Sequence, residues 1–233
     1  MTALLTDLGP FFAVETHPAG ATPQAPWRPL DELVQGGPVL RDRVDRVRHL
    51  LAAGRPDDAV ELRVAASVTH LGIVARLFSP AFAYALETGA VLDLADTWWQ
   101  PVDGGAVPLS IRDSATDRAG NIAVLLVEQV IDGVIRMIGE AAAKFSLSEQ
   151  ILWGNVASAV NGSARMLTAG RPTQATTIRA TASAVLAQRP LAGTSTVQDG
   201  HFRRRSCCLI YRAAPDHNGP ICGDCVLTTT RES

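Results

Sequence analysis

The residues best suited to chemistry are the four cysteines of the chain, which all lie near its C-terminus: Cys207, Cys208, Cys222 and Cys225. Thiolates are soft ligands that select iron–sulfur clusters or zinc, and four of them complete either kind of site. The spacing of Cys222 and Cys225 allows a turn in which both sulfurs point the same way. Taken alone, this CxxC motif fits zinc, a redox dithiol or a cluster about equally.

The adjacent cysteines discriminate better between these kinds of site. Cys207 and Cys208 are neighbours, and thirteen residues separate Cys208 from Cys222. Neighbouring side chains of a regular strand point to opposite faces, so a common site requires a bent backbone here. Structural zinc sites normally separate the members of each ligand pair, whereas a two-iron cluster offers two separate metal corners. The spacing therefore favours a [2Fe-2S] cluster, with zinc as the second interpretation and a vicinal disulfide as the third.

Composition restricts where such a site would operate. The chain has 233 residues, 47% of them hydrophobic, and a formal net charge of −2. Acids and bases are interspersed, so we expect no nucleic-acid partner and no attraction to a membrane surface. No targeting segment is visible, and the most apolar stretch, residues 64–86, contains Arg76 and Pro80, so no membrane span is predicted. We expect a cytoplasmic protein, and in that reducing compartment clustered cysteines favour a metal site over disulfides.

Hydrophobic periodicity predicts the elements that must position the cysteines. Short strands with a Gly-bearing turn are expected over residues 91–112, and a polar linker over residues 193–200. One helix is predicted over residues 39–53. A second begins near residue 56, is broken or kinked by Pro80, and is followed by a further helical piece that ends at Gly89. Three more are predicted: one over residues 121–143, one that begins with a capping box at Ser146–Glu149, and one between a cap at Thr173 and Pro190. We therefore predict an α+β fold: a mainly helical domain over residues 1–200, with a loop-rich N-terminal arm and a small antiparallel β-element, followed by a cysteine-bearing segment over residues 201–233.

Two stretches resemble the FhuF-like ferric-siderophore reductases. One is Arg204-Arg-Ser-Cys-Cys-Leu-Ile-Tyr-Arg212 followed by Cys222-Gly-Asp-Cys225-Val-Leu227, and the other is Ile151-Leu-Trp-Gly-Asn155-Val-Ala-Ser158. The resemblance is strong over residues 203–227 and fair over residues 146–168. It implies a cytoplasmic one-electron reductase of ferric siderophores, in which all four cysteines ligate a [2Fe-2S] centre and form the catalytic site. The loop between the two cysteine pairs is a few residues longer than is usual in the family, and the extra length includes Pro215–Gly219.

This resemblance agrees with the motifs that the chain lacks. No GxSxG, HExxH or P-loop motif is present, and no GxGxxG follows a strand, so neither a hydrolytic site nor bound NAD or FAD is expected. Electrons would come from a partner such as a ferredoxin, a flavodoxin or a separate flavin reductase, and ferric hydroxamates are the favoured substrates. Two alternatives stay open: a [2Fe-2S] electron carrier or redox sensor without siderophore turnover, and a zinc-stabilised binding module.

Arginines flank the cysteines at Arg203, Arg204, Arg205 and Arg212. Their positive charges would favour the reduced, more negative cluster and would raise its potential. They are also candidates for docking an acidic ferredoxin or an anionic siderophore. The alternative is a solvated basic edge with structural salt bridges.

Other side chains are candidates for supporting roles. Trp98 and Trp99 are expected to pack a hairpin on the helices rather than to form a platform for a chelate, and His70 is expected to be a core histidine. Asn155 is placed to hydrogen-bond a cluster-bearing loop or to pack between helices. His201 and His217 bracket the cysteine region, but with four cysteines at hand a mixed histidine ligation is not expected.

Overall fold

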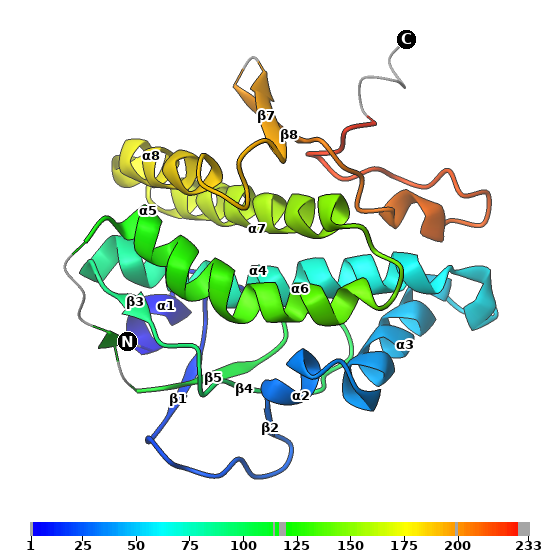
Figure 1. Cartoon of the computed structure of the whole chain (residues 1–233), viewed down its shortest axis with the longest axis horizontal. Helices are drawn as coiled ribbons and strands as arrows, with labels where there is room; N and C mark the ends of the chain where they lie inside the picture. The colour runs from blue at the N-terminus through cyan, green and yellow to red at the C-terminus, as the bar shows by residue number, and fades with distance from the viewer. Residues whose placement is uncertain (1, 114, 117–119, 199, 228–233) are drawn as a thin grey trace.

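The computed structural model describes residues 2–113, 115–116, 120–198 and 200–227, and helices dominate this part of the chain (Figure 1). The α-helices are α1 (Thr2–Thr6), α2 (Asp31–Val34), α3 (Pro38–Ala52), α4 (Leu62–Thr88), α5 (Ile122–Leu125), α6 (Arg136–Ala143), α7 (Glu149–Gly170) and α8 (Ala175–Leu186). The π-helix η2 (Leu126–Ile135) joins α5 to α6, and the short 3-10 turns are η1 (Asp57–Ala59), η3 (Pro172–Gln174) and η4 (Ile210–Ala213). With the strands below, the fold is mainly helical α+β, as predicted.

The strands form one small sheet and two separate strand pairs. They are β1 (Glu15–His17), β2 (Arg28–Pro29), β3 (Val91–Leu92), β4 (Trp98–Trp99), β5 (Leu109–Arg112), β6 (Ala115–Thr116), β7 (Ser195–Gln198) and β8 (His201–Arg204). The sheet has the order β1-β5-β4-β2, while β3 pairs with β6 and β7 with β8. Because β1 runs parallel to β5, the sheet is mixed and not purely antiparallel. Strands were predicted between residues 91 and 112, whereas β1 and β2 come from the expected N-terminal arm.

Helix α4 forms the centre of the core and packs against α3 and α7. Its apolar side chains are buried on almost every side, among them Val64, Leu77 and Phe82, each with no exposed surface. By length and composition α4 could cross a membrane, but 78% of its most apolar window is buried inside the fold. This burial is that of a core helix and not of a helix that faces lipid.

The predicted alternatives at Pro80 were a break or a kink, and the break is wrong, because α4 continues through this proline to Thr88. A proline inside a helix removes one backbone hydrogen bond and costs about 3 kcal/mol. Leu77, Phe78 and Phe82 around it are fully buried, and burying each such side chain contributes about 2 kcal/mol. Tertiary packing therefore outweighs the local penalty at Pro80.

The helix predicted over residues 121–143 consists of α5, η2 and α6. Its apolar residues recur at steps of four, which on a regular α-helix would drift around the axis by about 40° per step. Leu126, Val130 and Ile138 nevertheless all remain buried, in a segment that is interrupted by a kink. Gly133 leaves helical geometry within η2, with φ −86° and ψ −119°.

Three local predictions are corrected by the structure. Ser148, not Ser146, caps α7, because its side chain accepts a hydrogen bond from the Ile151 backbone N–H. Gln174 and not Thr173 precedes α8, since a 3-10 turn occupies residues 172–174. The expected linker over residues 193–200 contains β7, which pairs with β8.

The helices separate the sheet from the cysteine segment. Figure 1 shows the β1–β5–β4–β2 sheet on one side of the helical layers, and the β7–β8 hairpin with the C-terminal segment on the other, above α7 and α8. Contacts between α7 and β8 hold the hairpin against the helices. Helix α7 therefore supports the hairpin that leads to the cysteines, and α4 contacts the turn η4 that follows Cys208.

Candidate metal centre

The four cysteines come together as two pairs of sulfur atoms. Cys207 Sγ lies 4.0 Å from Cys225 Sγ, and Cys208 Sγ lies 3.8 Å from Cys222 Sγ. All four are free thiols, so no vicinal disulfide forms. Each of these two pairs takes one cysteine from the adjacent Cys–Cys motif and one from the CxxC motif, and a hydrogen bond from Cys207 to Cys208 joins the two pairs.

The backbone bends where the sequence requires it. Strand β8 ends at Arg204, before the cysteines, and Leu209 takes a left-handed conformation with φ 69°. The Leu209 N–H then donates to Cys207 Sγ at 3.3 Å, and the Leu227 N–H donates to Cys225 Sγ at 3.4 Å. These turns let adjacent cysteines face one site, and each supplies an amide donor to a sulfur.

This donor set fits a two-metal cluster. Two thiolates on one tetrahedral metal, with metal–sulfur bonds of about 2.3 Å, lie about 3.8 Å apart. Both sulfur pairs have close to this separation. Two pairs of thiols, one pair for each iron, match the ligand requirement of a [2Fe-2S] unit.

Arg204 is the buried charge beside the thiols. Its side chain has no exposed surface, and its Nη2 donates to Cys222 Sγ at 2.8 Å. Its Nη1 donates to Asn155 Oδ1 at 2.9 Å, and its Nε lies 3.6 Å from Asp224 Oδ2. Burial acts to lower the pKa of Arg204, but the charges of Cys208, Asp224 and Cys222 outweigh it and raise that pKa. Arg204 is therefore a permanent cation within the site.

The thiols themselves share their protons unequally. Hydrogen bonds from Cys207 and Cys222, with the nearby charge of Arg204, lower the pKa of Cys208 against the opposing effect of burial. Donating to Cys208 raises the pKa of Cys207 and of Cys222, and burial adds to both effects. Cys208 thus ionises before Cys207 and Cys222, and metal ligation requires thiolates.

One face of α7 carries the residues that receive this segment. Gly154 leaves no room for a side chain, because an added Cβ would lie 2.0 Å from Ser206 Oγ. Asn155 binds Arg204 through its oxygen and donates through Nδ2 to Ser67 O at 3.1 Å. Ser158 Oγ donates to the carboxylate of Asp224, inside the CxxC motif. Sequence analysis identified Asn155 but missed Gly154 and Ser158, although all three lie on one helical turn within the stretch that resembles the FhuF family.

The four flanking arginines have different surroundings. Arg204 is buried, so it cannot dock an electron donor or a siderophore at the surface, as was considered from the sequence. Its role lies inside the site instead. Arg205 is exposed, Arg203 lines a cavity beside β8, and Arg212 forms an ion pair with Glu61. For these three arginines, docking remains a prediction.

The aromatic and histidine candidates lie away from the sulfurs. Trp98 and Trp99 are buried in the sheet on the opposite side of the helices, and Trp98 stacks on His17 with ring centroids 3.9 Å apart. His217 is exposed, and its Nδ1 lies 2.9 Å from Arg212 O. His70 is a buried core histidine, as predicted, and its Nδ1 lies 3.4 Å from Asn155 Nδ2. Packing in the sheet, and not chelate binding, is the role of the tryptophans.

Comparison with known families decides which cofactor these thiols serve. Residues 204–227 match the family model of the FhuF 2Fe-2S C-terminal domain. The chain holds a [2Fe-2S] cluster. The match begins at Arg204, ends at Leu227 and includes all four cysteines, so the FhuF-type segment coincides with the site described above. A comparison with curated proteins found no relative.

Proposed function

We propose that this chain is a cytoplasmic ferric-siderophore reductase, which transfers one electron to a bound Fe(III) chelate and so releases Fe(II). The observation that carries the proposal is the arrangement of Cys207 with Cys225 and of Cys208 with Cys222, inside the FhuF-type segment. We assign these four cysteines as the ligands of the [2Fe-2S] cluster. When bound, such a cluster takes up and passes on a single electron.

The chemistry of the substrate makes one electron sufficient. Siderophores hold Fe(III) through hard, charged oxygens, which match the hard ferric ion. Fe(II) is bound much less tightly by the same oxygens, so reduction of the metal loosens the complex. The reaction consumes one electron and no bond of the organic chelate is broken, so the protein needs neither a nucleophile nor a general base.

The residues around the thiols have two tasks. Arg204 keeps a positive charge against Cys222, which stabilises additional negative charge in the site. Asn155 and Ser158 hold Arg204 and Asp224 in place from the rigid surface of α7. Cys208 and Cys225 are buried, whereas Cys207 and Cys222 are partly exposed, which leaves one side of the site open to a reaction partner.

A separate protein would supply the electron. Because the sequence has no dinucleotide fingerprint, we expect a ferredoxin, a flavodoxin or a flavin reductase as the donor. Arg203, Arg205 and Arg212 remain candidates for docking that donor or the siderophore.

An anaerobic titration tests the function. Dithionite-reduced, desalted holoprotein is mixed with ferric hydroxamates and ferric catecholates while the visible cluster bands are followed and a chelator traps Fe(II). Rapid return of the oxidised spectrum with a matching amount of Fe(II) is the expected result. A cluster that stays reduced with every ferric chelate would instead identify an electron carrier or a redox sensor.

A further inference from the structure

A cavity of about 750 Å³ lies beside the cysteine segment, between α7, α8 and the β7–β8 hairpin. The CxxC turn supplies part of its wall through Gly223 and Asp224, which lie between Cys222 and Cys225. A molecule in this cavity therefore contacts the backbone that carries two of the thiols. This volume is within the range of small-molecule sites, which is roughly 300–1,000 Å³.

One helical face leads from the cysteine segment into this cavity. Gly154 and Ser158 contact the segment, and Asn161 and Arg165 of the same helix line the cavity. Residues spaced by three or four positions share a face of a helix, so these four form a single stripe on α7. The thiols and the cavity thus belong to one continuous surface.

The cavity is positively charged. Arg165 of α7, Arg179 of α8 and Arg203 of β8 line it, and Asp224 is the acidic residue of its described lining. Asp224 is already engaged by Arg204 and Ser158. No carboxylate among the described residues lies within 4.0 Å of the Arg165 or Arg179 guanidinium. The charges of both arginines are therefore available to an anionic ligand.

Apolar side chains complete the walls. Phe202 and Leu186 line the cavity, and Val197 on the β7 side is 67% exposed, the most exposed large hydrophobic side chain described. Such surfaces suit the hydrocarbon parts of an organic chelate.

We propose that this cavity binds an anionic ferric chelate, of the catecholate or hydroxycarboxylate class, next to the CxxC turn. The proposal rests on the proposed reductase function and changes its favoured substrate from the ferric hydroxamates expected from the sequence to anionic ferric chelates. A hydroxamate carries one negative charge, so three hydroxamates leave Fe(III) complexes neutral. A catecholate carries two, which leaves the ferric complex strongly anionic and complementary to Arg165 and Arg179.

The same charges would also assist the reduction. In the proposed reductase reaction, an external one-electron donor such as a reduced ferredoxin or flavin is the source of the electron with which this protein converts Fe(III) to Fe(II) in the bound chelate. The chelate then carries one more negative charge, and neighbouring guanidinium groups stabilise it more than they stabilise the ferric form. The cavity thereby favours both binding and reduction of an anionic complex.

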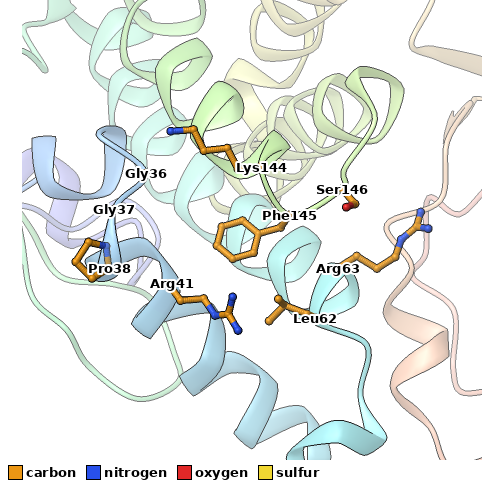
Figure 2. A pocket seen from close by; sticks show the side chains of 9 residues that line it. All are labelled: Gly36, Gly37, Pro38, Arg41, Leu62, Arg63, Lys144, Phe145 and Ser146. Atoms are coloured by element: carbon orange, nitrogen blue, oxygen red, sulfur yellow. The ribbon is translucent and has the colours of Figure 1, made fainter.

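A second basic cavity provides a matched control. It has a volume of about 580 Å³, and its lining includes Arg41, Arg63 and Lys144 but no residue of the cysteine segment. Figure 2 shows Lys144 and Arg41 on the α3 side of Phe145, with Arg63 directed the other way. Reversing the charges of Arg41 and Lys144 changes the net charge as much as reversing those of Arg165 and Arg179, at a different place.

The test measures binding without electron transfer. Ga(III) has the charge and nearly the radius of Fe(III) but is not reduced. Titration calorimetry of the holoprotein with Ga(III) complexes therefore measures the binding affinity without electron transfer. We expect the Ga(III)–tris-catecholate to bind at least about tenfold more tightly than a Ga(III)–trihydroxamate, and Arg165→Glu/Arg179→Glu to weaken it by at least about tenfold. Arg41→Glu/Lys144→Glu should change the affinity by less than about twofold. An unchanged visible spectrum of each variant shows that the cluster site is intact.

Each result separates the two proposals. Equal affinity for the two Ga(III) complexes, no binding of the catecholate, or an equal loss in both double variants would overturn the assignment of the cavity. These outcomes would not bear on the reductase function, which the Fe(III) titration described above tests separately. Conversely, tight and cavity-dependent Ga(III) binding together with a cluster that no ferric chelate reoxidises would reject the reductase and retain the binding site.

Discussion

The buried guanidinium of Arg204 donates a hydrogen bond to Cys222 Sγ across 2.8 Å. The same side chain contacts Asn155 on α7 and lies beside Asp224, so it connects the thiols to the helical core. A permanent positive charge thus contacts one of the four sulfurs directly, out of contact with solvent. Charge at such a position acts on the redox equilibrium more strongly than charge at the surface, because water screens it less.

We expect Arg204→Gln to lower the reduction potential. The reduced site carries more negative charge than the oxidised site, so removing the cation destabilises the reduced form. A loss of about 1.4 kcal/mol of this preference corresponds to a fall of ~59 mV for a one-electron couple. Spectroscopic redox titration of the holoprotein measures the change.

Two variants control this experiment. Arg204→Lys retains the charge and should keep the potential much closer to that of the wild type. Arg205→Gln removes the neighbouring exposed arginine and should have little effect, since solvent screens that charge. Equal shifts in Arg204→Gln and Arg205→Gln would contradict a specific role for the buried guanidinium.

Gly154→Ala should displace the cysteine segment from α7. An added Cβ would meet Ser206 Oγ at 2.0 Å, a separation that no pair of non-bonded atoms tolerates. We expect a lower melting temperature and a lower cluster content, although an alanine normally stabilises a helix interior by up to about 1 kcal/mol relative to glycine. Thermal unfolding followed by circular dichroism, with iron analysis, measures both effects.

The same helix supplies the control for this substitution. An added Cβ at Gly162 meets nothing within 4 Å, so Gly162→Ala should stabilise the protein slightly. Adding Ser206→Gly to Gly154→Ala removes the clashing hydroxymethyl group and should restore much of the loss. Similar behaviour of the two alanine variants would show that Gly154 is not a packing requirement.

Each of Cys207, Cys208, Cys222 and Cys225 should be needed for the wild-type cluster spectrum. Replacing any one by serine removes a thiolate from one of the two sulfur pairs, and oxygen is a poorer ligand for an iron–sulfur unit. We expect a lost or altered visible spectrum with lower iron and sulfide content. Ser206→Ala, next to Cys207, should keep the wild-type spectrum, and any cysteine variant that also keeps it is not a ligand.

The free energy of unfolding should fall in mild acid because His70 is buried. Burial lowers the pKa of His70 to about 3, from an unfolded value of 6.5, so the histidine stays neutral in the folded state. The unfolded chain therefore binds more protons below pH 6.5, and stability falls as the pH falls through this window. Between pH 7.5 and 5.5 the wild type should lose about 1.4 kcal/mol more than His70→Gln. Urea unfolding at both pH values measures this difference, and parallel losses in the two proteins would contradict it.

Sequence patterns predicted a metal centre because the four cysteines are chemically distinctive and lie within one short stretch of the chain. The cysteines, the helix over residues 39–53 and the strands between residues 91 and 112 are all signalled by local spacing, and the structure confirms these elements as α3 and as β3, β4 and β5. Asn155 was a candidate because it lies in the stretch that resembles the FhuF family, with a role in helix packing as the alternative. These features depend on neighbours in the sequence, which is why they could be predicted.

The remaining features depend on contacts between distant segments. Gly154 matters only because Ser206 comes to rest against it, and α4 passes through Pro80 only because its surroundings are fully buried. The burial of Arg204 goes with its contacts to Asn155 and Asp224, which come from other parts of the chain. Strand β8, which carries Arg204, was not predicted, because residues 193–200 have the composition of a linker although they include the partner strand β7.

The crossed pairing of the sulfurs has a consequence for the loop between the two motifs. Cys208 and Cys222 delimit residues 209–221, and their sulfurs meet across the base of this loop. The tip at Pro215–Asn218 is exposed and lies beyond the backbone bond from Gly219 N–H to Tyr211 O. Doubling the length of a closed loop costs only about 0.6 kcal/mol in chain entropy. The tip is therefore an insertion point, where a reporter peptide or a purification tag can be placed while the spacing of the thiols is preserved.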